Sequence, residues 1–382
     1  MSSQGTHTMS MLRVALTRDG DDIAMRTCGQ TGIPRGKNAA LYPRRDLELH
    51  TILLRSALRD YQENGRGDSE LRRLAQRGHD AWRVFKDAKS AQSDRLDRFI
   101  TANMKPWSNG VTRRPLLQPL LEVTCDGLFF PFELLYPADP ARKLNPRGFL
   151  GMRFMIVKHG WDFALDSDEL SQTPTASLSL GYARAHHLAA SEAAALKEIS
   201  GFRVHDYTAD ITDPEDARHQ FQAIWGTPGE GHHLIHLSAH AAEQRLTGET
   251  RNREGLKLGT GFVPQDSLSS VSGTQEFVPL VFLNACRSNG TATLNGYTSY
   301  AQKLYPKLAC GFVLTNCDVH DDFASLYSET FYKQLVQQTN LGLAVIATRE
   351  ELWEKHRDLT VLAYQLYCVD PDITFSMRRG VR

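Results

Sequence analysis

The fold is decided by two apolar segments, which read L-I-H-L-S-A-H at 234–240 and L-V-F-L-N-A-C at 280–286. Each is a short apolar run of strand length, which predicts a buried strand. In an open parallel sheet, reactive residues gather beyond the carboxyl ends of the strands. If these two strands are neighbours, His240 and Cys286 end side by side, because paired strands lie about 4.8 Å apart.

Strands and helices alternate regularly around these two segments. Further strands are predicted near 177–182, 202–205, 311–314 and 361–367, and helices near 191–199, 213–225, 297–305, 321–336 and 342–356. Alternation of this kind predicts an α/β fold with a mostly parallel sheet flanked by helices.

The leading half of the chain is different in character. It is predicted to hold a strand at 12–16, a basic and loop-rich stretch through Arg45, helices at 46–61 and from Asp68 or Ser69 onward, and strands and turns over 120–161. A polar segment at 166–175 follows and is typical of a linker. We therefore expect an elaborated N-terminal α+β region at 1–165, packed on a core at 176–382.

Composition excludes several classes of protein. The 382 residues carry 44 basic and 44 acidic side chains, so there is no net positive charge to bind nucleic acid or an anionic membrane. The polar N-terminus lacks a signal-peptide core, and no apolar run is long enough to span a bilayer. Six scattered cysteines without a C-x-x-C pair indicate reduced thiols. A soluble, cytoplasmic protein is expected.

A cysteine and a histidine at neighbouring strand ends can form a catalytic dyad. The thiolate is the reactive form of cysteine, and an imidazole nearby can accept the thiol proton and later donate it to a leaving amine. The alternative is a buried Cys286 and a capping His240 with no chemical role. The shared location of both residues at strand ends favours the dyad.

The histidines at 232, 233, 236 and 240 raise the question of a metal site. On a helix His236 and His240 would share a face, but the apolar run around His236 predicts a strand. Four strand residues span about 13 Å, which is too far for one ion to bridge. H-E-x-x-H is absent as well, so neither a metal nor another cofactor is expected.

Three stretches of the chain resemble the CHAT proteases, bacterial relatives of caspases, separases and gingipains. The strand ending in His240 is similar to the family's strand ending in His-Gly, and L-N-A-C-R-S at 283–288 is similar to its nucleophile motif. P-F-E-L-L at 131–135 resembles an upstream Pro-Trp-Glu-Leu-Leu signature. A weaker similarity runs over 311–332, where Asp-Asp and Phe-Tyr pairs fit the pattern.

The resemblance implies a caspase-like fold and a cysteine endopeptidase that cuts a limited set of protein substrates. Cys286 would attack the scissile carbonyl and His240 would carry the proton. The oxyanion would be held by the backbone N–H groups of Cys286 and Ala241. Family relatives act in bacterial defence or regulated cell death, which implies an activating partner or signal.

Ala241 departs from the family, which has glycine at this position. Alanine still offers its N–H group but adopts positive φ less readily than glycine. This departure leaves open a second class of function, a catalytically weak interaction module with the caspase fold. A third possibility is acyl transfer to an acceptor other than water.

Acidic residues replace the family's tryptophan in the loop after the strand at 311–314. Asp318 takes that position, and Asp321 and Asp322 follow. An acid near the substrate pocket would favour arginine or lysine on the amino side of the cleaved bond. The alternative for Asp321 and Asp322 is that they open a helix at its positive end.

The segment 241–277 is rich in glycine, serine, threonine and charged residues. It is predicted to contain a short hairpin or strand near 256–258, and otherwise to be a long loop that leaves directly from His240. Loops of this length are often functional.

Overall fold

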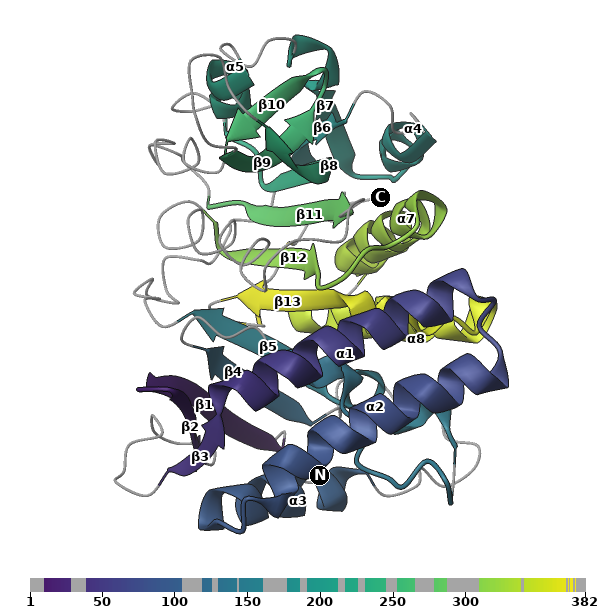
Figure 1. Cartoon of the computed structure of the whole chain (residues 1–382). Helices are drawn as coiled ribbons and strands as arrows, with labels where there is room; N and C mark the ends of the chain where they lie inside the picture. Colours follow the sequence, from purple (N-terminus) through teal and green to yellow (C-terminus); the bar gives the residue numbers. More distant parts are fainter. Residues whose placement is uncertain are drawn as a thin grey trace, which may run out of the picture. The chain divides into compact units, whose positions relative to one another are not determined.

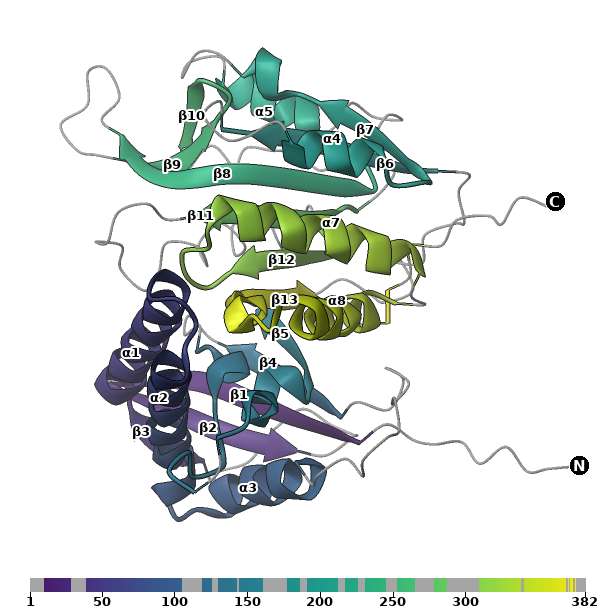
Figure 2. The same ribbon diagram turned by 90° about the vertical axis from the view of Figure 1, so that its right-hand side faces the viewer.

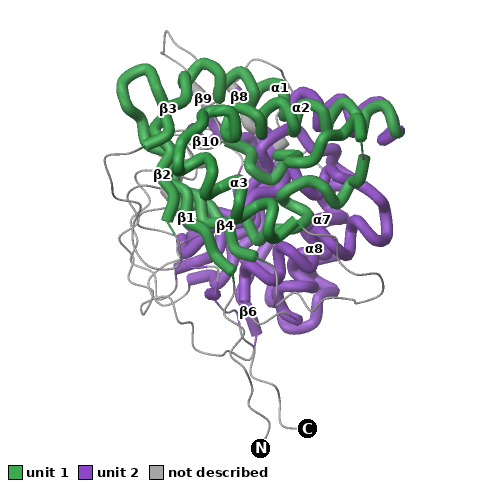
Figure 3. The backbone as a smooth tube through the Cα atoms, turned by 90° about the horizontal axis from the view of Figure 1, so that it is seen from below, with its two compact units in different colours: residues 1–54, 68–161 green, residues 55–67, 162–382 purple. Residues whose placement is uncertain are grey.

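A computed structural model describes most of the chain and divides it into two compact units (Figure 3). The described residues are 10–28, 39–104, 119–125, 130–142, 144–160, 177–185, 191–211, 217–225, 231–244, 253–264, 278–286, 309–337, 340–368, 370, 372, 373 and 375. Unit 1 comprises residues 1–54 and 68–161, and unit 2 comprises residues 55–67 and 162–382. The predicted linker at 166–175 and the predicted helix at 297–305 lie outside the described residues.

Unit 1 is built on a mixed sheet. Its described strands are β1 (Met11–Asp19), β2 (Asp22–Cys28), β3 (Ala40–Pro43), β4 (Leu120–Cys125) and β5 (Met155–Gly160). They run in the order β5-β4-β1-β2-β3, and β4 is parallel to both β1 and β5. The antiparallel strands β2 and β3 lie in the stretch that was expected to be loop-rich, so that prediction is wrong for these two segments. A two-residue turn at Gly20, where φ is +62°, closes the β1–β2 hairpin.

Three helices complete unit 1 or begin in it. They are α1 (Arg44–Glu63), which continues into unit 2 beyond Leu54, α2 (Asp68–Asp87) and α3 (Ala91–Asn103). The predicted helix from Asp68 onward is confirmed by α2, which buries one apolar face through Leu74, Ala75, Ala81, Trp82 and Phe85. Helix α3 was not predicted, and the Ser90 side chain caps it by accepting a bond from the Ser93 N–H.

The P-F-E-L-L segment lies in the core of unit 1. The Phe132 ring packs against those of Phe85 and Phe130, with centroids 5.5 and 5.4 Å away. The Glu133 carboxylate forms an ion pair with the Lys158 ammonium on β5 at 2.9 Å, and both side chains are fully buried. This segment therefore holds unit 1 together through packing and one buried ion pair.

Unit 2 carries the predicted alternating pattern (Figure 1). Its described strands are β6 (Leu178–Arg184), β7 (Phe202–Asp206), β8 (Leu234–Gln244), β9 (Arg253–Leu258), β10 (Gly261–Pro264), β11 (Leu280–Cys286), β12 (Gly311–Thr315) and β13 (Tyr364–Cys368). Strands β7-β6-β8-β11-β12 are parallel neighbours in this order. β13 joins β12 antiparallel, and β9 and β10 form an antiparallel extension beyond β8.

Helices cover the sheet of unit 2. They are α4 (Ser191–Lys197), α5 (Ala217–Ile224), α7 (Asp321–Gln337) and α8 (Leu341–His356), and α4, α7 and α8 lie along one face (Figure 2). A short 3-10 helix, Leu359–Ala363, takes the first part of the last predicted strand because the Asp358 side chain caps it at the Thr360 N–H. The α/β class with a mostly parallel sheet is confirmed. Within the described part of the chain, no helix has the length and apolar character to cross a membrane.

Candidate active site

The strands that end in His240 and Cys286 are parallel neighbours, as predicted. Their register runs from Leu234 opposite Leu280 to His240 opposite Cys286 without a break. His240 is half-buried. The backbone of Cys286 is described and its side chain lies outside the described part, so strand register alone relates the two positions. That register puts the two positions on the same face of the sheet, at one level of the ladder.

β8 does not end at His240. It continues to Gln244, and its last residues pair antiparallel with β9, beginning with His240 opposite Lys257. The expectation of a loop leaving directly from His240 is therefore wrong, while the expected hairpin near 256–258 is confirmed by β9 and β10. The physical reason is that β6 ends at Arg184, so β9 takes over as the partner of β8 on that side.

Strand alternation fixes the direction of the Ala241 peptide group. The Leu280 N–H donates to the His233 carbonyl at 3.0 Å, and on the opposite side the Ser238 carbonyl accepts from the Ala185 N–H at 2.8 Å. Because successive peptide groups of a strand alternate in direction, the odd-numbered residues of β8 face β11. The Ala241 N–H is therefore directed toward β11 at the level of Cys286.

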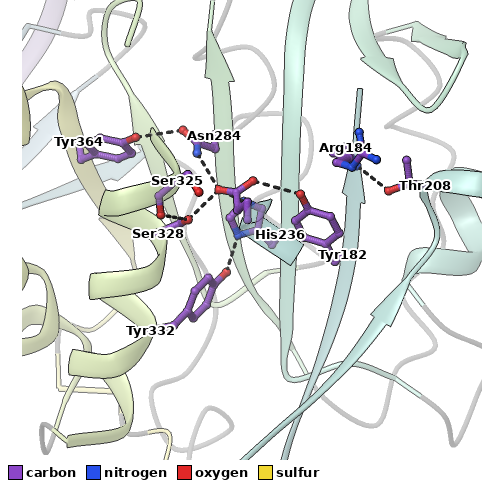
Figure 4. Close-up of polar contacts among 10 residues, drawn as sticks. Tyr182, Arg184, Thr208, His236, Asn284, Ser325, Ser328, Tyr332 and Tyr364 are labelled. Atoms are coloured by element: carbon purple, nitrogen blue, oxygen red, sulfur yellow. Dashed lines mark hydrogen bonds and ion pairs between the residues drawn. The ribbon is translucent and has the colours of Figure 1, made fainter. Parts of the chain in front are cut away.

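A buried carboxylate lies among polar groups of the same sheet. Glu192, in the first turn of α4, accepts hydrogen bonds from the Ser328 hydroxyl at 2.7 Å, the Tyr182 hydroxyl at 3.1 Å and the Asn284 amide at 3.2 Å (Figure 4). The His236 Nε2 lies 3.4 Å from its Oε1 atom. We call Glu192 and these four partners the Glu192 cluster.

Two tyrosines connect the cluster to its surroundings. The Tyr364 hydroxyl on β13 donates to the Asn284 Oδ1 at 3.0 Å, and the Tyr332 hydroxyl on α7 lies 3.2 Å from the His236 Nδ1 (Figure 4). Asn284 and His236 stand two and four residues before Cys286 and His240. Strand alternation therefore places the cluster on the same face of the sheet as positions 240 and 286, nearer the amino ends of the strands.

Sequence reasoning missed this cluster, although signals were present. Asn284 and His236 interrupt apolar runs in central strands, where asparagine is depleted. A buried polar side chain needs hydrogen-bond partners, so each of these positions indicated a polar network. His236 and His240 lie in strand β8, as predicted, and not on a helix where they would share a face. Among the described residues, no group of three or more histidine, cysteine, aspartate or glutamate side chains could hold a metal ion.

The surroundings of Glu192 keep it ionised. Burial alone would raise its pKa, but the charge of His236 and hydrogen bonds from His236, Ser328 and Ser238 lower the pKa to about 2. Burial and the Glu192 charge raise the pKa values of Tyr182 and Tyr332. The carboxylate is therefore an acceptor, and both tyrosine hydroxyls stay protonated at neutral pH.

The depressed pKa of Glu192 predicts a loss of stability in acid. A carboxyl group with a folded pKa of about 2 and an ordinary value of 4.5 stabilises the fold above pH 4.5, and this contribution is lost as the pH falls toward 2. About 2 kcal/mol should be gone by pH 3. The free energy of unfolding, measured in urea, should change less between pH 6 and pH 3 for Glu192→Gln than for wild type. An equal change in the two proteins would contradict this prediction. Glu63→Gln, which alters an exposed carboxylate, is the control.

The predicted acidic residues follow β12: Asp318 precedes α7, and Asp321 and Asp322 begin it. Asp318 is half-buried three residues after the end of β12, the neighbour of β11, and its carbonyl accepts a hydrogen bond from the Gln62 amide at 3.0 Å. Asp321 and Asp322 are exposed in the first turn of α7. There a negative side chain stabilises the helix through its dipole. Of the three, Asp318 is the residue that lies outside the helix.

Comparisons with known proteins identify similar solved structures but no matching family. No protein-family model matches this sequence, and no curated protein sequence matches it. One similar solved structure is a complex of the RgpB pro- and mature domains from Porphyromonas gingivalis, with 11% identity over 82% of this chain and 77% of that chain and a TM-score of 0.45.

Two further solved structures are similar to this chain, over different shares of its length. The separase–securin complex of Saccharomyces cerevisiae has 11% identity, a TM-score of 0.47, and covers 94% of this chain but 30% of the matched chain. Protein GSU0716 from Geobacter sulfurreducens has 13% identity, a TM-score of 0.33, and covers 53% of this chain and 98% of that one. At TM-scores below 0.5, these similarities carry no information about activity.

Proposed function

We propose that the chain is a cysteine endopeptidase of caspase-like fold that cuts a limited set of protein substrates. The observation that supports this proposal is the register that puts Cys286 opposite His240 at the carboxyl end of parallel strands. Reactive residues gather at such ends in open parallel sheets. The motif resemblance of 283–288 points to the same residue as the nucleophile.

The two residues divide the chemistry between them. His240 accepts the proton of the Cys286 thiol, and the thiolate attacks the scissile carbonyl carbon. The imidazolium then donates its proton to the leaving amine as the carbon–nitrogen bond breaks, which leaves an acyl-enzyme. A water molecule, deprotonated by His240, hydrolyses the thioester and restores the thiol. No metal or cofactor enters these steps.

The oxyanion would be held by the N–H groups of Cys286 and Ala241. The Ala241 N–H is directed toward Cys286, which supports its part in this role. In a parallel ladder an N–H group with this direction bonds to the Cys286 carbonyl. The Ala241 N–H can therefore bind an oxyanion only after this last backbone hydrogen bond between β8 and β11 has broken. This requirement supports a latent enzyme that a protein partner or another signal activates. Roles in bacterial defence or regulated cell death fit such control.

A digest of a peptide library tests the proposal directly. Wild-type protein should cleave a subset of peptides, and both Cys286→Ala and His240→Ala should abolish this cleavage. A latent enzyme should gain activity when cell lysate is added as a source of activator. Cleavage that persists in both variants, or that is absent with and without lysate, would overturn the proposal.

One observation favours the second candidate, an interaction module. Ala241 lies within β8 and pairs with Leu256 of β9, so this position is extended strand and does not use the freedom of a glycine. A thiol-reactivity assay separates the two functions. A catalytic Cys286 should be alkylated faster than the other five cysteines, whereas similar rates for all six would favour the module.

Asp318 is proposed to select a basic residue on the amino side of the cleaved bond. A charge-assisted hydrogen bond to arginine contributes about 1.5–3 kcal/mol. Asp318→Asn is therefore expected to lower kcat/KM for an arginine peptide by about 10- to 100-fold relative to its methionine counterpart. An unchanged ratio of the two kcat/KM values would disprove this role. Asp321→Asn and Asp322→Asn should be measured in the same way, with Asp87→Asn in unit 1 as the control.

A further inference from the structure

We propose that Asn284 and Thr315 are positioning residues that hold the end of β11, and thereby the Cys286 backbone, at the level of His240. This inference rests on the proposed function and extends it. Neither side chain is part of the dyad. Both act on the residues that directly precede the nucleophile.

Asn284 is held at both ends of its amide group. It is 2% exposed, its Nδ2 donates to Glu192 Oε1 at 3.2 Å, and its Oδ1 accepts from the Tyr364 hydroxyl at 3.0 Å. An ionised carboxylate can only accept, so it determines which end of the amide faces it. The side chain two residues before Cys286 is thus fixed between α4 on one side and β13 on the other.

Thr315 fixes the next residue of β11. Its hydroxyl donates to the Ala285 carbonyl at 3.1 Å, and the side chain is fully buried. The register between β11 and β12 ends where Leu283 pairs with Leu314. Ala285 therefore lies beyond the last backbone pair with β12, and the Thr315 hydroxyl satisfies a carbonyl that this ladder leaves without a partner.

The Thr315 contact holds the end of β11 on its β12 side, where the backbone hydrogen bonds of the sheet have already ended. On the β8 side the ladder continues to Cys286, whereas on the β12 side it stops three residues earlier. Catalytic groups that move by about 1 Å can lose about 100-fold in rate. The bonds of Asn284 to α4 and β13, and the bond from Thr315 of β12 to β11, therefore set how well the thiol and the imidazole meet.

Conservative variants separate a positioning role from simple core stability. Thr315→Val keeps the side-chain shape and removes the hydroxyl, and Tyr364→Phe removes the donor to Asn284 but keeps the ring stacked on Tyr327 at 3.5 Å. Thr315→Ser keeps the hydroxyl and should behave as wild type. The matched control is Thr348→Val, which removes a buried hydroxyl bonded to the Ala344 carbonyl at 2.7 Å in α8.

The pH dependence of Cys286 alkylation by iodoacetamide, located by mass spectrometry, is the primary readout. Thr315→Val and Tyr364→Phe should shift the apparent pKa of the Cys286 thiol upward and slow its alkylation at pH 6.5 by about 10-fold, since a displaced thiolate loses its imidazolium partner. On a cleaved peptide, kcat should fall by a similar factor at unchanged KM. Thr348→Val should change neither.

The outcomes are distinguishable. The pH profile of Cys286 alkylation in each variant is compared with that of wild type. If it shifts in His240→Ala but not in Thr315→Val or Tyr364→Phe, the dyad is supported and the positioning role is wrong. If His240→Ala leaves the profile unchanged, the dyad itself is wrong and the positioning role falls with it. A shift in Thr348→Val equal to that in Thr315→Val would also overturn the inference, because the effect would then not be specific to β11.

Discussion

Replacing Cys286 with alanine is expected to lower kcat/KM for the best peptide substrate by at least about 1,000-fold. Removing the nucleophile of a covalent mechanism leaves only binding and oxyanion stabilisation, and losses of about 10⁴- to 10⁶-fold are typical of such residues. The measurement is the initial rate of peptide cleavage with purified wild type and variant at matched concentration. A His240→Ala variant should lose a comparable factor, because the thiol then lacks its base.

The effects of the two replacements should not add. Residues that act as one unit are strongly non-additive, so the double variant Cys286→Ala/His240→Ala should retain about the same residual rate as Cys286→Ala alone. A double variant that loses the product of both factors would contradict a shared proton-transfer step. It would indicate two independent contributions.

A matched cysteine serves as the control. Cys28 on β2 of unit 1 is half-buried, and burial raises the pKa of its thiol, so it is a poor nucleophile at neutral pH. Cys28→Ala should cleave at the wild-type rate. Full activity of Cys286→Ala, or loss of activity in Cys28→Ala alone, would place the nucleophile elsewhere in the chain.

The parts of the fold that sequence predicts well are those with a strong hydrophobic period. The parallel strands β6, β8, β11 and β12 are short runs of apolar residues. Helices α2 and α7 have long apolar faces, and the start of α8 at 341–347 is apolar throughout, so the predicted places of these elements are close to those observed. The pairing of β2 with β3 is hard to predict because charged residues at the start of β2 hide its apolar alternation. The Asp19-Gly20 pair is a hairpin signal for the turn between β1 and β2.

The candidate site shows where local reasoning stops. The positions of His240 and Cys286 followed from two strands and one topological rule. The Glu192 cluster did not, because its members come from α4, β6, β8, β11 and α7 and are up to 146 residues apart, as between Tyr182 and Ser328. Only the fold determines which buried polar side chains meet. The strand extension of β8 beyond His240 likewise depends on β9, whose pairing no local pattern specifies.

Lys158→Met is expected to cause the largest loss of stability in unit 1. Lys158 and Glu133 form a 2.9 Å ion pair with both side chains fully buried. Removing one partner breaks the buried ion pair, which typically costs about 3–5 kcal/mol. The free energy of unfolding, measured by urea denaturation with circular dichroism, should fall by about this amount. The exposed pair of Arg83 and Asp87 is the control, and Arg83→Met should change stability by less than about 1 kcal/mol.

The double variant Glu133→Leu/Lys158→Met decides what this pair contributes. Replacing a buried ion pair by apolar side chains of similar volume is often neutral or stabilising, because neither charge then has to be desolvated. The double variant should therefore recover most of the stability that Lys158→Met loses. If it is as unstable as the single variant, the cost comes from packing around Phe132 and Glu133. In that case the P-F-E-L-L segment stabilises unit 1 through its shape, and the charge of Glu133 is incidental.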